Sequence, residues 1–286
     1  MTVTRDSDRS IWRRLFGNPR LIIALMVIVL MIGMALSANL LAPYSYKEQA
    51  RGSELLSPVA SFWFGTDFLG RDVLSRVMYG AQISMLVGIA ATAVALVIGV
   101  TVGLVSGFFG GSIDALLMRL TDTIAAFPSL LLAIAITALY DRPSMGIVYF
   151  ALGVVGWTGM ARIVRAEVLS IKTLDYVTAA QALGVGSGRI IFRHILPNCL
   201  SPIIIITTLA IGGNILGEAG LSFLGLGVQD PFPSWGGMLA DARSYFHAYW
   251  WVAVFPGLAI VLTVLSFNLL GDGLRDALDP RQSMLK

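Results

Sequence analysis

Long apolar runs separated by short polar segments dominate the chain. Six of these runs are long enough to cross a hydrocarbon core about 30 Å thick, which takes roughly 20 helical residues. They lie near residues 21–41, 83–107, 115–139, 146–163, 200–221 and 251–270. The pattern therefore predicts an all-α polytopic membrane protein with six transmembrane helices.

Composition supports a lipid-covered exterior. Of the 286 residues, 56% are hydrophobic and only 13% are charged, whereas a soluble domain carries about 25% charged residues. The net charge of +3 is too small to indicate a nucleic-acid partner. Cys199 has no partner for an internal disulfide, and His194 and His247 have no ligand-type neighbours at metal-binding spacing. We expect no metal site, no bound cofactor and no enzymatic centre in this chain.

Two sequence features say more about particular spans. Gly99, Gly103 and Gly107 recur every four residues, so we expect a neighbouring helix to pack closely against them. The first span has a basic start, as a secretory signal does, but its apolar run exceeds the 7–15 residues typical of a signal core. We expect it to be a retained anchor helix.

Orientation follows from the distribution of Lys and Arg between the loops. With a cytoplasmic N-terminus and six spans, the inside segments hold fourteen of the twenty basic residues and the outside segments hold six. Arg119 is counted in the connection between the second and third spans. The excess predicts that both termini, and the long loop between the fourth and fifth spans, are cytoplasmic.

That cytoplasmic loop carries the clearest local signals. Within residues 162–198, Asp175 is a good N-cap and Gly184 a good C-terminal stop for a helix over Tyr176–Leu183. Small residues occupy its middle, namely Ala179, Ala180 and Ala182. Such a short helix can lie in a groove of another protein. Pro197 is expected to open the fifth span, where its missing N–H costs nothing. The alternative is a solvated basic loop that only follows the positive-inside rule.

The loop resembles the "EAA" motif of permeases from importers of the ATP-binding-cassette (ABC) type. Thr178-Ala179-Ala180 is followed, at the motif's spacing, by Gly184 and by Leu196-Pro197, but Thr178 replaces the family Glu and His194 replaces the family Ile. Further similar segments follow in order: FGTDFLGRDVLSR, MRLTD with AFPSLLLAI, VRAEVLS, GEAGLSFLGLGVQ, PSWGGML and NLLGDGLRDALDP. From about Phe64 to Arg281, the chain looks like the C-type permease of dipeptide, oligopeptide and nickel importers.

The resemblance implies a type I ABC-importer permease in a bacterial inner membrane. It would pair with a related second permease, two ATPase subunits holding ATP and Mg, and an external substrate-binding protein. Residues 1–80 would form a cytoplasmic segment, the first span and an external loop, and residues 81–286 a five-helix core with a coupling loop over 164–197. The ATPase-coupling residues would be Asp175, Tyr176, Val177, Thr178, Ala179, Ala180, Leu183, Gly184, Leu196 and Pro197.

Thr178 departs from the motif at an informative position. With Asp175 as N-cap, residue 178 is the third helical residue, where a Glu would complete a capping box. Thr supplies neither the reach nor the negative charge, so the helix should be weaker by roughly 0.5–1 kcal/mol. The hypothesis is that docking survives through shape.

Polar residues and a proline inside the spans are candidates for a pore or gate. Asp122 lies three residues after Arg119, so a local ion pair is the simpler reading. Glu218, near Asn214, could face the pore or bond to a neighbouring helix, and the sequence does not decide between these. Pro128 is expected to kink the third span.

The segment Gly225–Trp250 is too polar to span and is rich in aromatics. By resemblance it would line the outer mouth of the pore, and the alternative is an interfacial anchor through residues such as Trp235. Near residue 71, the Arg71-Asp72 pair is expected to cap a helix at the membrane surface.

Two other classes of protein compete with an ABC permease. An ion-coupled carrier commonly shows inverted repeats, which this sequence lacks. A membrane enzyme needs a catalytic constellation, and Gly184–Arg189 lacks the Lys-Ser/Thr ending of a phosphate loop. The cargo stays open between peptides and other small solutes such as nickel or glutathione, with peptides leading on family frequency.

Overall fold

The computed structural model describes residues 18–278 of the chain. Within these residues the protein is helical and contains no β-strand, only two isolated bridges between residues 59 and 72. The predicted cytoplasmic N-terminal segment before residue 18 and the C-terminal tail after residue 278 lie outside the described residues.

The helices are long, and most match the predicted spans. In chain order they are α2 (Pro19–Leu41), α3 (Val73–Phe109), α4 (Gly111–Ala125), α5 (Ser129–Thr137), α6 (Met145–Ile171), α7 (Asp175–Ala182), α8 (Ser187–Ile190), α9 (Leu200–Phe223), α10 (Trp235–Ala242) and α11 (Trp251–Leu278). A π-helical turn (Ile191–Ile195) and a 3₁₀ turn (Leu196–Cys199) join α8 to α9. Among the described residues, five helical stretches are long and apolar enough to cross a membrane, or six when α4 and α5 are taken as one bent span.

Several helices extend past the apolar runs that predicted them. The start of α3 is Val73 rather than a residue near 83, because Asp72 caps it by accepting a hydrogen bond from the Ser75 N–H at 2.8 Å. Asp72 of the predicted Arg71-Asp72 pair therefore caps a helix, but that helix is the long apolar α3 rather than a helix at the membrane surface. α6 continues to Ile171 rather than ending near residue 163. Helix ends follow capping and tertiary contacts, which hydropathy does not register.

The third span is broken rather than kinked. α4 and α5 meet at an angle of 82°, and Pro128 lies in the break, directly before α5. Proline cannot continue a helix ladder, because it lacks an N–H and its ring clashes with the preceding turn. Arg119 lies inside α4, not in a connection as expected; the turn between α3 and α4 is made by Gly110 and Gly111, at φ of 66° and 56°.

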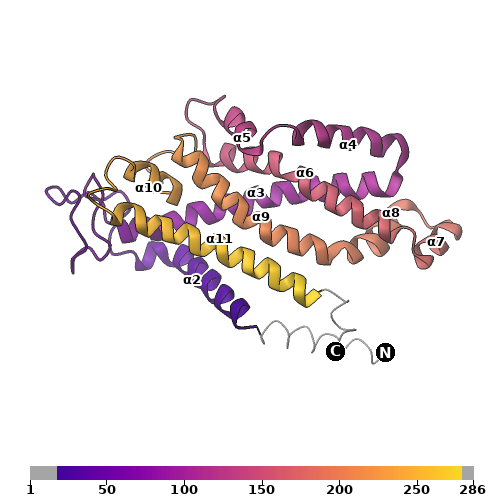
Figure 1. Ribbon diagram of the computed structural model, residues 1–286, viewed down its shortest axis with the longest axis horizontal. Coiled ribbons are helices and arrows are strands. Elements are labelled where there is room, and N and C mark those ends of the chain that lie inside the picture. The colour runs from indigo at the N-terminus through magenta and orange to yellow at the C-terminus, as the bar shows by residue number, and fades with distance from the viewer. Residues whose placement is uncertain (1–17, 279–286) are drawn as a thin grey trace.

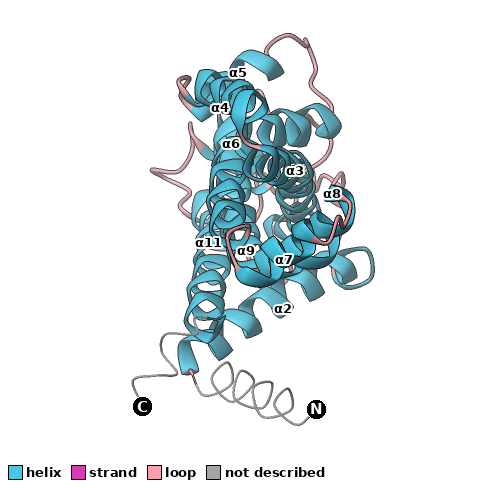
Figure 2. Cartoon of the chain, turned by 90° about the vertical axis from the view of Figure 1, so that its right-hand side faces the viewer, coloured by secondary structure: helices cyan, strands magenta, loops and turns pink. Residues whose placement is uncertain are grey.

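The helices form one elongated bundle with α3 at its centre. α3 packs chiefly against α6 and α9, while α11 packs against α9 and α2. Viewed along the bundle, α4 and α5 lie at one edge and α2 lies at the opposite edge (Figure 2). α7 and α10 lie at opposite ends of the bundle, which we call the α7 end and the α10 end (Figure 1).

The glycine stripe of α3 is where α6 approaches closely, as predicted. A Cβ on Gly99 would lie 2.8 Å from the Met160 Cβ, and one on Gly103 would lie 2.7 Å from the Ala161 carbonyl oxygen. A Cβ on Gly107 would lie 2.7 Å from the Val168 Cβ. Real side chains do not tolerate such distances, so glycine is required for this packing.

Candidate coupling site

α7 is held at its end of the bundle by the helix that precedes it. α6 ends at Ile171, and the Lys172 side chain donates a 2.8 Å hydrogen bond to the carbonyl of Gly107, near the end of α3. Leu174 then turns the chain, and α7 begins at Asp175. The bundle therefore presents α7 crosswise at its tip rather than on a free loop (Figure 2).

The cap of α7 differs from the prediction in register. Leu174, not Asp175, occupies the N-cap position, and no side chain caps the helix. Thr178 is thus the fourth helical residue, and its hydroxyl donates to the carbonyl of Asp175 at 3.0 Å. The capping-box argument for the missing Glu was therefore wrong, although Asp175 still places negative charge in the first turn.

The predicted stop at Gly184 is confirmed. Gly184 has a φ of 74°, a left-handed conformation that glycine adopts without strain. Its N–H donates to the Gln181 carbonyl at 3.0 Å, and the N–H of Val185 donates to the Ala180 carbonyl at 3.1 Å. These two bonds form a Schellman motif, which satisfies carbonyls that the helix end would leave unpaired.

α7 rests on the bundle through one side. Val177 is fully buried, and Ala180, one turn later, is partly buried. Both pack on an apolar cluster built from the ends of α3 and α6 and from the joint before α9, which we call the α7 seat. Its buried members are Leu104, Met160, Val164, Val168, Ile171, Val177, Ile190, Ile191, Ile195, Cys199 and Ile203. The seat brings together the predicted coupling residues Val177, Ala180 and Leu196.

The rest of α7 is exposed and partly apolar. Leu183 is 84% exposed, and Leu174 and Tyr176 are each more than two-fifths exposed. Between these side chains, Thr178 and Ala179 are exposed and small. The exposed side of α7 and its two flanking leucines therefore combine large apolar side chains with small residues.

The link from α7 to α9 is a continuous but irregular helical joint. Helix begins again at Ser187, so Pro197 does not open the span as expected but lies within a helical run over Ser187–Phe223. Because Pro197 has no N–H to donate, the chain around it forms a π turn and a 3₁₀ turn instead of a regular α-helix. Asn198 donates hydrogen bonds to the Tyr176 hydroxyl at 3.2 Å and to the His194 carbonyl at 2.6 Å, so the joint also contacts α7 directly.

The predicted pore or gate residues do not gather in one place. Glu218 is fully buried and accepts hydrogen bonds from Ser84 at 3.0 Å and from Ser222 at 2.6 Å. Asn214 donates to the Thr92 hydroxyl at 2.9 Å. Of the two readings for Glu218, the structure shows bonding between neighbouring helices.

Asp122 of α4 pairs with a residue of α6, not with Arg119 of its own helix as predicted. Its carboxylate lies 2.7 Å from the Arg162 guanidinium of α6, so the predicted local pair with Arg119 was wrong. A second pair, Arg165 with Asp114, ties the same two helices together at 2.6 Å. The sequence separation of about 40 to 50 residues hid both pairs.

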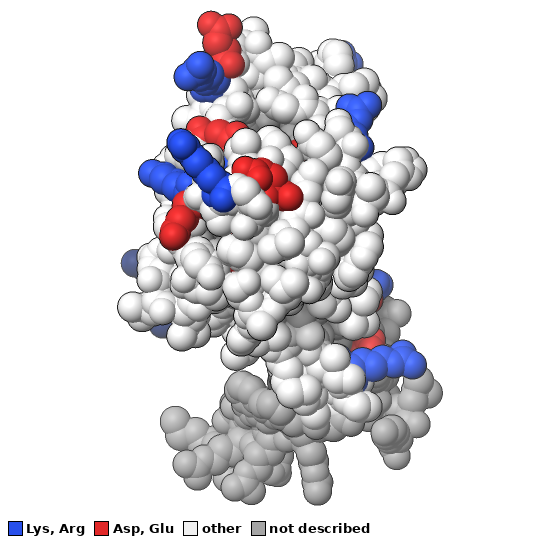
Figure 3. All heavy atoms as spheres, turned by 90° about the vertical axis from the view of Figure 1, so that its left-hand side faces the viewer, with Lys and Arg blue, Asp and Glu red and all other residues white. Residues whose placement is uncertain are grey.

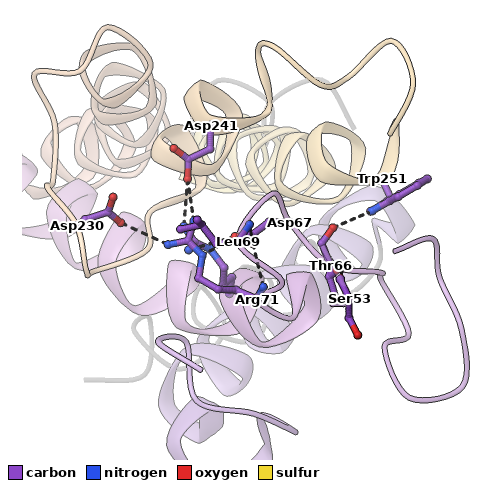
Figure 4. A network of polar contacts seen from close by, with 9 residues as sticks. Ser53, Thr66, Asp67, Leu69, Arg71, Asp230, Asp241 and Trp251 are labelled. Carbon is purple, nitrogen blue, oxygen red and sulfur yellow. Dashed lines mark hydrogen bonds and ion pairs between the residues drawn. The ribbon is translucent and has the colours of Figure 1, made fainter. Parts of the chain in front are cut away.

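The α10 end contains a buried ion network that the sequence did not predict. Arg71 and Arg76 are 5% and 3% exposed, and both contact Asp67 and Asp241 (Figure 4). The closest contact is Arg71 Nε to Asp67 Oδ2 at 2.6 Å, while Asp230 lies at 3.7 Å and is largely exposed. The four-residue spacing between Asp67 and Arg71 is the one sequence signal that indicates this network.

The network draws α10 onto the start of α3. Asp241 of α10 accepts from Arg71 at 3.3 Å and from Arg76 at 3.4 Å. Burial raises the pKa of Asp241 above its ordinary value, because lost hydration outweighs the attraction of the two guanidinium groups. From that end of the bundle, acidic and basic side chains lie side by side on the surface (Figure 3).

Trp235 does not anchor the chain at an interface, the alternative considered for its segment. It is fully buried, and its indole N–H donates to the Val77 carbonyl at 3.0 Å. Among residues 18–278, no group of three or more His, Cys, Asp or Glu side chains is arranged to hold a metal ion.

The described residues form a bundle of helices long and apolar enough to span a membrane, with a short exposed helix at one tip. The chain matches the family described as the binding-protein-dependent transport system inner membrane component over residues 99–284. It also matches the N-terminal transmembrane domain of oligopeptide transport permease C over residues 9–58. This protein therefore belongs to the family of inner-membrane components of binding-protein-dependent transport systems and is a multi-pass permease.

Relatives extend over nearly the whole chain. The chain is 46% identical over 273 residues to the dipeptide transport system permease protein DppC of Alkalihalophilus pseudofirmus, covering 96% of this chain and 90% of the relative. It is 41% identical to the oligopeptide transport system permease protein OppC of Bacillus subtilis (95% and 90% covered). It is 43% identical to the glutathione transport system permease protein GsiD of Pectobacterium atrosepticum (98% and 95% covered).

Proposed function

We propose that this chain forms half of the translocation pore of an ATP-driven importer for dipeptides or oligopeptides. A second, homologous permease forms the other half, two ATPase subunits bind the cytoplasmic face, and an external binding protein delivers the cargo. α7, the loop over 164–197 and both termini face the cytoplasm. Residues 81–286 form the permease core, and residues 1–80 precede it.

The observation that carries the proposal is that α7 is anchored to the bundle by one buried side chain while the rest of it stays exposed. Seven of its eight residues are at least partly exposed, while Val177 fixes it to the α7 seat. A helix that is mounted rigidly but left uncovered at the tip of a bundle is suited to receive a groove of another protein. The coupling surface comprises Asp175, Tyr176, Thr178, Ala179 and Leu183; Val177, Ala180, Gly184, Leu196 and Pro197 hold it in place.

Chemistry is assigned to the partner subunits. In this proposal ATP and Mg bind to the ATPases and this chain supplies the path; the glycine-rich segment after α7 lacks a phosphate-loop ending, which is consistent with that division. No nucleic acid takes part. Coupled in this way, the chain needs no cofactor of its own.

α4 and α6 carry the candidate pore surface. Asp122 and Arg162 have side chains that are 66% and 50% exposed, within stretches apolar enough to span the membrane. Charged groups exposed to lipid are costly, so this face meets water or protein rather than hydrocarbon. Pro128 and the break beside it give the same region a place to bend. Asn214 and Glu218 take part by holding α9 against α3.

Peptide cargo is supported by the names of the relatives, of which several transport dipeptides or oligopeptides. Glutathione, nickel or another small solute is the second candidate, and the glutathione-system relative favours it. Binding of dipeptides, glutathione and Ni²⁺ to the external binding protein that delivers the cargo, measured by calorimetry, decides between them. Binding of Ni²⁺ alone would overturn the peptide assignment.

Ala179→Asp tests the coupling role. Ala179 is exposed, so the substitution leaves the fold intact while placing a charge on the docking face. We expect the ATPases to co-purify poorly with the variant and ATP-driven uptake to fall at least about tenfold, equivalent to a loss of about 1.4 kcal/mol. Ser187→Asp, on the same loop but outside α7, is the matched control and should retain uptake. Wild-type uptake by the Ala179 variant would show that α7 is not the coupler.

A further inference from the structure

A polar cavity lies where the start of α2 meets the end of α11. It has a volume of about 410 Å³, and its charged lining residues are Arg20 of α2 and Asp272, Arg275 and Asp276 of α11. The two helices touch at this point, because a Cβ on Gly273 would overlap the side chain of Leu21. Both helix ends lie toward the α7 end of the bundle, away from α10 (Figure 1).

The cavity carries charges of both signs. Arg20 and Arg275 supply two guanidinium groups, and Asp272 and Asp276, one helical turn apart, supply two carboxylates. All four residues are exposed. The ion pairs found among residues 18–278 engage other arginines, namely Arg71, Arg76, Arg162 and Arg165. The lining therefore matches a ligand that carries an anionic and a cationic group close together.

The cavity lies at the level of a membrane surface. α2 has 23 residues, which span about 34 Å, and a hydrocarbon core is about 30 Å thick. A helix of this length is used up in crossing the core, so its first residues lie among the lipid headgroups. Arg20 belongs to that first turn, and the continuous apolar run of α2 begins with Leu21.

An apolar groove follows α2 from the next residues into the membrane. It has a volume of about 480 Å³ and is lined by Ile22, Leu25, Met26, Val29 and Leu30. The distance along the helix from the first to the last of these residues is about 12 Å, which is most of one half of the hydrocarbon core. The lining thus changes from charged to apolar at the depth where a phospholipid changes from headgroup to acyl chain.

The balance of charges distinguishes between lipid headgroups. An anionic headgroup such as phosphatidylglycerol would pair with the arginines but would leave Asp272 and Asp276 without a cation. The ammonium group of phosphatidylcholine carries no N–H and donates no hydrogen bond to a carboxylate. An ethanolamine headgroup offers a phosphate to Arg20 and Arg275 and an ammonium group with three N–H donors to the two aspartates. Basic pockets between spanning helices are known to bind lipid headgroups, and the two carboxylates adapt this one to a zwitterion.

We propose that this site binds one phosphatidylethanolamine molecule in the leaflet on the α7 side. Arg20 and Arg275 hold its phosphate, Asp272 and Asp276 hold its ammonium group, and one acyl chain lies in the groove of α2. The lipid joins the end of α11 to the start of α2. This site is independent of the cargo and of the coupling role of α7, since it requires only that the chain spans a membrane.

The test measures lipid binding to the full chain by native mass spectrometry. The chain is purified in detergent, stripped of lipid and titrated separately with dioleoyl phosphatidylethanolamine, phosphatidylglycerol and phosphatidylcholine. We expect the first lipid to bind about fivefold more tightly than the other two. Glycerophosphoethanolamine, which is the same headgroup without acyl chains, should bind at least about tenfold more weakly than the lipid.

Variants of the charged lining should change this preference in opposite ways. Asp272→Asn combined with Asp276→Asn removes both carboxylates, so phosphatidylglycerol should then bind more tightly than phosphatidylethanolamine. Arg275→Gln should weaken phosphatidylethanolamine binding about fivefold, and Arg20→Gln takes its place if that variant does not fold. Arg193→Gln removes an exposed arginine of the joint before α9, on the same side of the bundle, and should keep the preference of the parent chain.

Each contrary outcome overturns the proposal. Equal affinities of the parent chain for the three lipids would show that the cavity does not select a headgroup. A preference for phosphatidylethanolamine that survives in the double Asn variant would place the selection elsewhere. Equally tight binding of glycerophosphoethanolamine would show that the groove holds no acyl chain and that the site takes a soluble phosphoester. Loss of the preference in the Arg193 control would show that overall charge, not this cavity, decides binding.

Discussion

The two ends of the bundle are held together by different kinds of contact. At the α10 end, two buried arginines and two aspartates fasten α10 to the start of α3, and a fully buried glutamate with serines fastens it to α9. At the α7 end, an apolar seat, the exposed Asn198–Tyr176 hydrogen bond and the Lys172–Gly107 hydrogen bond hold α7. Buried ionic contacts are geometrically specific and costly to break, whereas apolar packing with few polar contacts allows small shifts. The comparison indicates a fixed α10 end and an adjustable α7 end.

The largest expected effect comes from breaking the ion network at the α10 end. Asp67→Ala leaves Arg71 and Arg76 with Asp241 as their close partner and removes acceptors for the N–H groups of Leu69 and Arg71. An uncompensated buried charge costs about 3–5 kcal/mol. Thermal unfolding of the purified protein in detergent should show a large drop in Tm.

The matched control for this prediction is Asp230→Ala. Asp230 lies 3.7 Å from Arg71, and its side chain is 73% exposed. Exposed ion pairs contribute about 0–1 kcal/mol, so its Tm should stay near that of the wild type. Equal losses in the two variants would show that burial does not distinguish the network.

An intermediate effect is expected at the α7 seat. Val177→Ala removes two methyl groups from a fully buried position, at a cost of about 1–2 kcal/mol of apolar burial and cavity formation. Because the loss is confined to the tip, local amide exchange in α7 should rise while the Tm of the bundle changes little. Unchanged exchange in α7 would contradict the role of Val177 as its anchor.

Asn198→Ala separates the polar tie from the apolar seat. The Asn198–Tyr176 bond is exposed, and such a bond is worth about 0.5–1 kcal/mol. Amide exchange in α7 should rise less than in the Val177 variant. A larger rise would mean that the polar tie, not the seat, fixes α7.

The smallest effect is expected for Thr178→Glu, which restores the family residue. Thr178 is the fourth helical residue. A Glu there gains only the favourable interaction of its negative charge with the helix dipole, which is worth about 0.3–0.5 kcal/mol. Stability should barely change, and any gain should appear in the affinity for the ATPases, measured by titration in nanodiscs. A fall in α7 amide exchange as large as the rise expected for Val177→Ala would restore the capping-box interpretation.

Local and periodic sequence patterns correctly predicted the helical spans and several of their details. The apolar runs located the spans, the four-residue glycine period located the closest helix contact, and Gly184 located the end of α7. These signals work because each depends on neighbouring residues along one helix. The seat residue Val177 was included in the coupling motif, but its burial depends on side chains from three other segments.

What the sequence by itself determined is a bundle of apolar helices with a short helix on its basic loop. Tertiary structure alone decided the partners of the polar groups: Arg162 for Asp122, Ser84 and Ser222 for Glu218, and Asp241 for Arg71 and Arg76. The physical reason is the sequence distance over which each interaction acts. Helix formation is set within a few turns, whereas a buried charge must be paired by whichever group the packed bundle brings to it, up to 170 residues away.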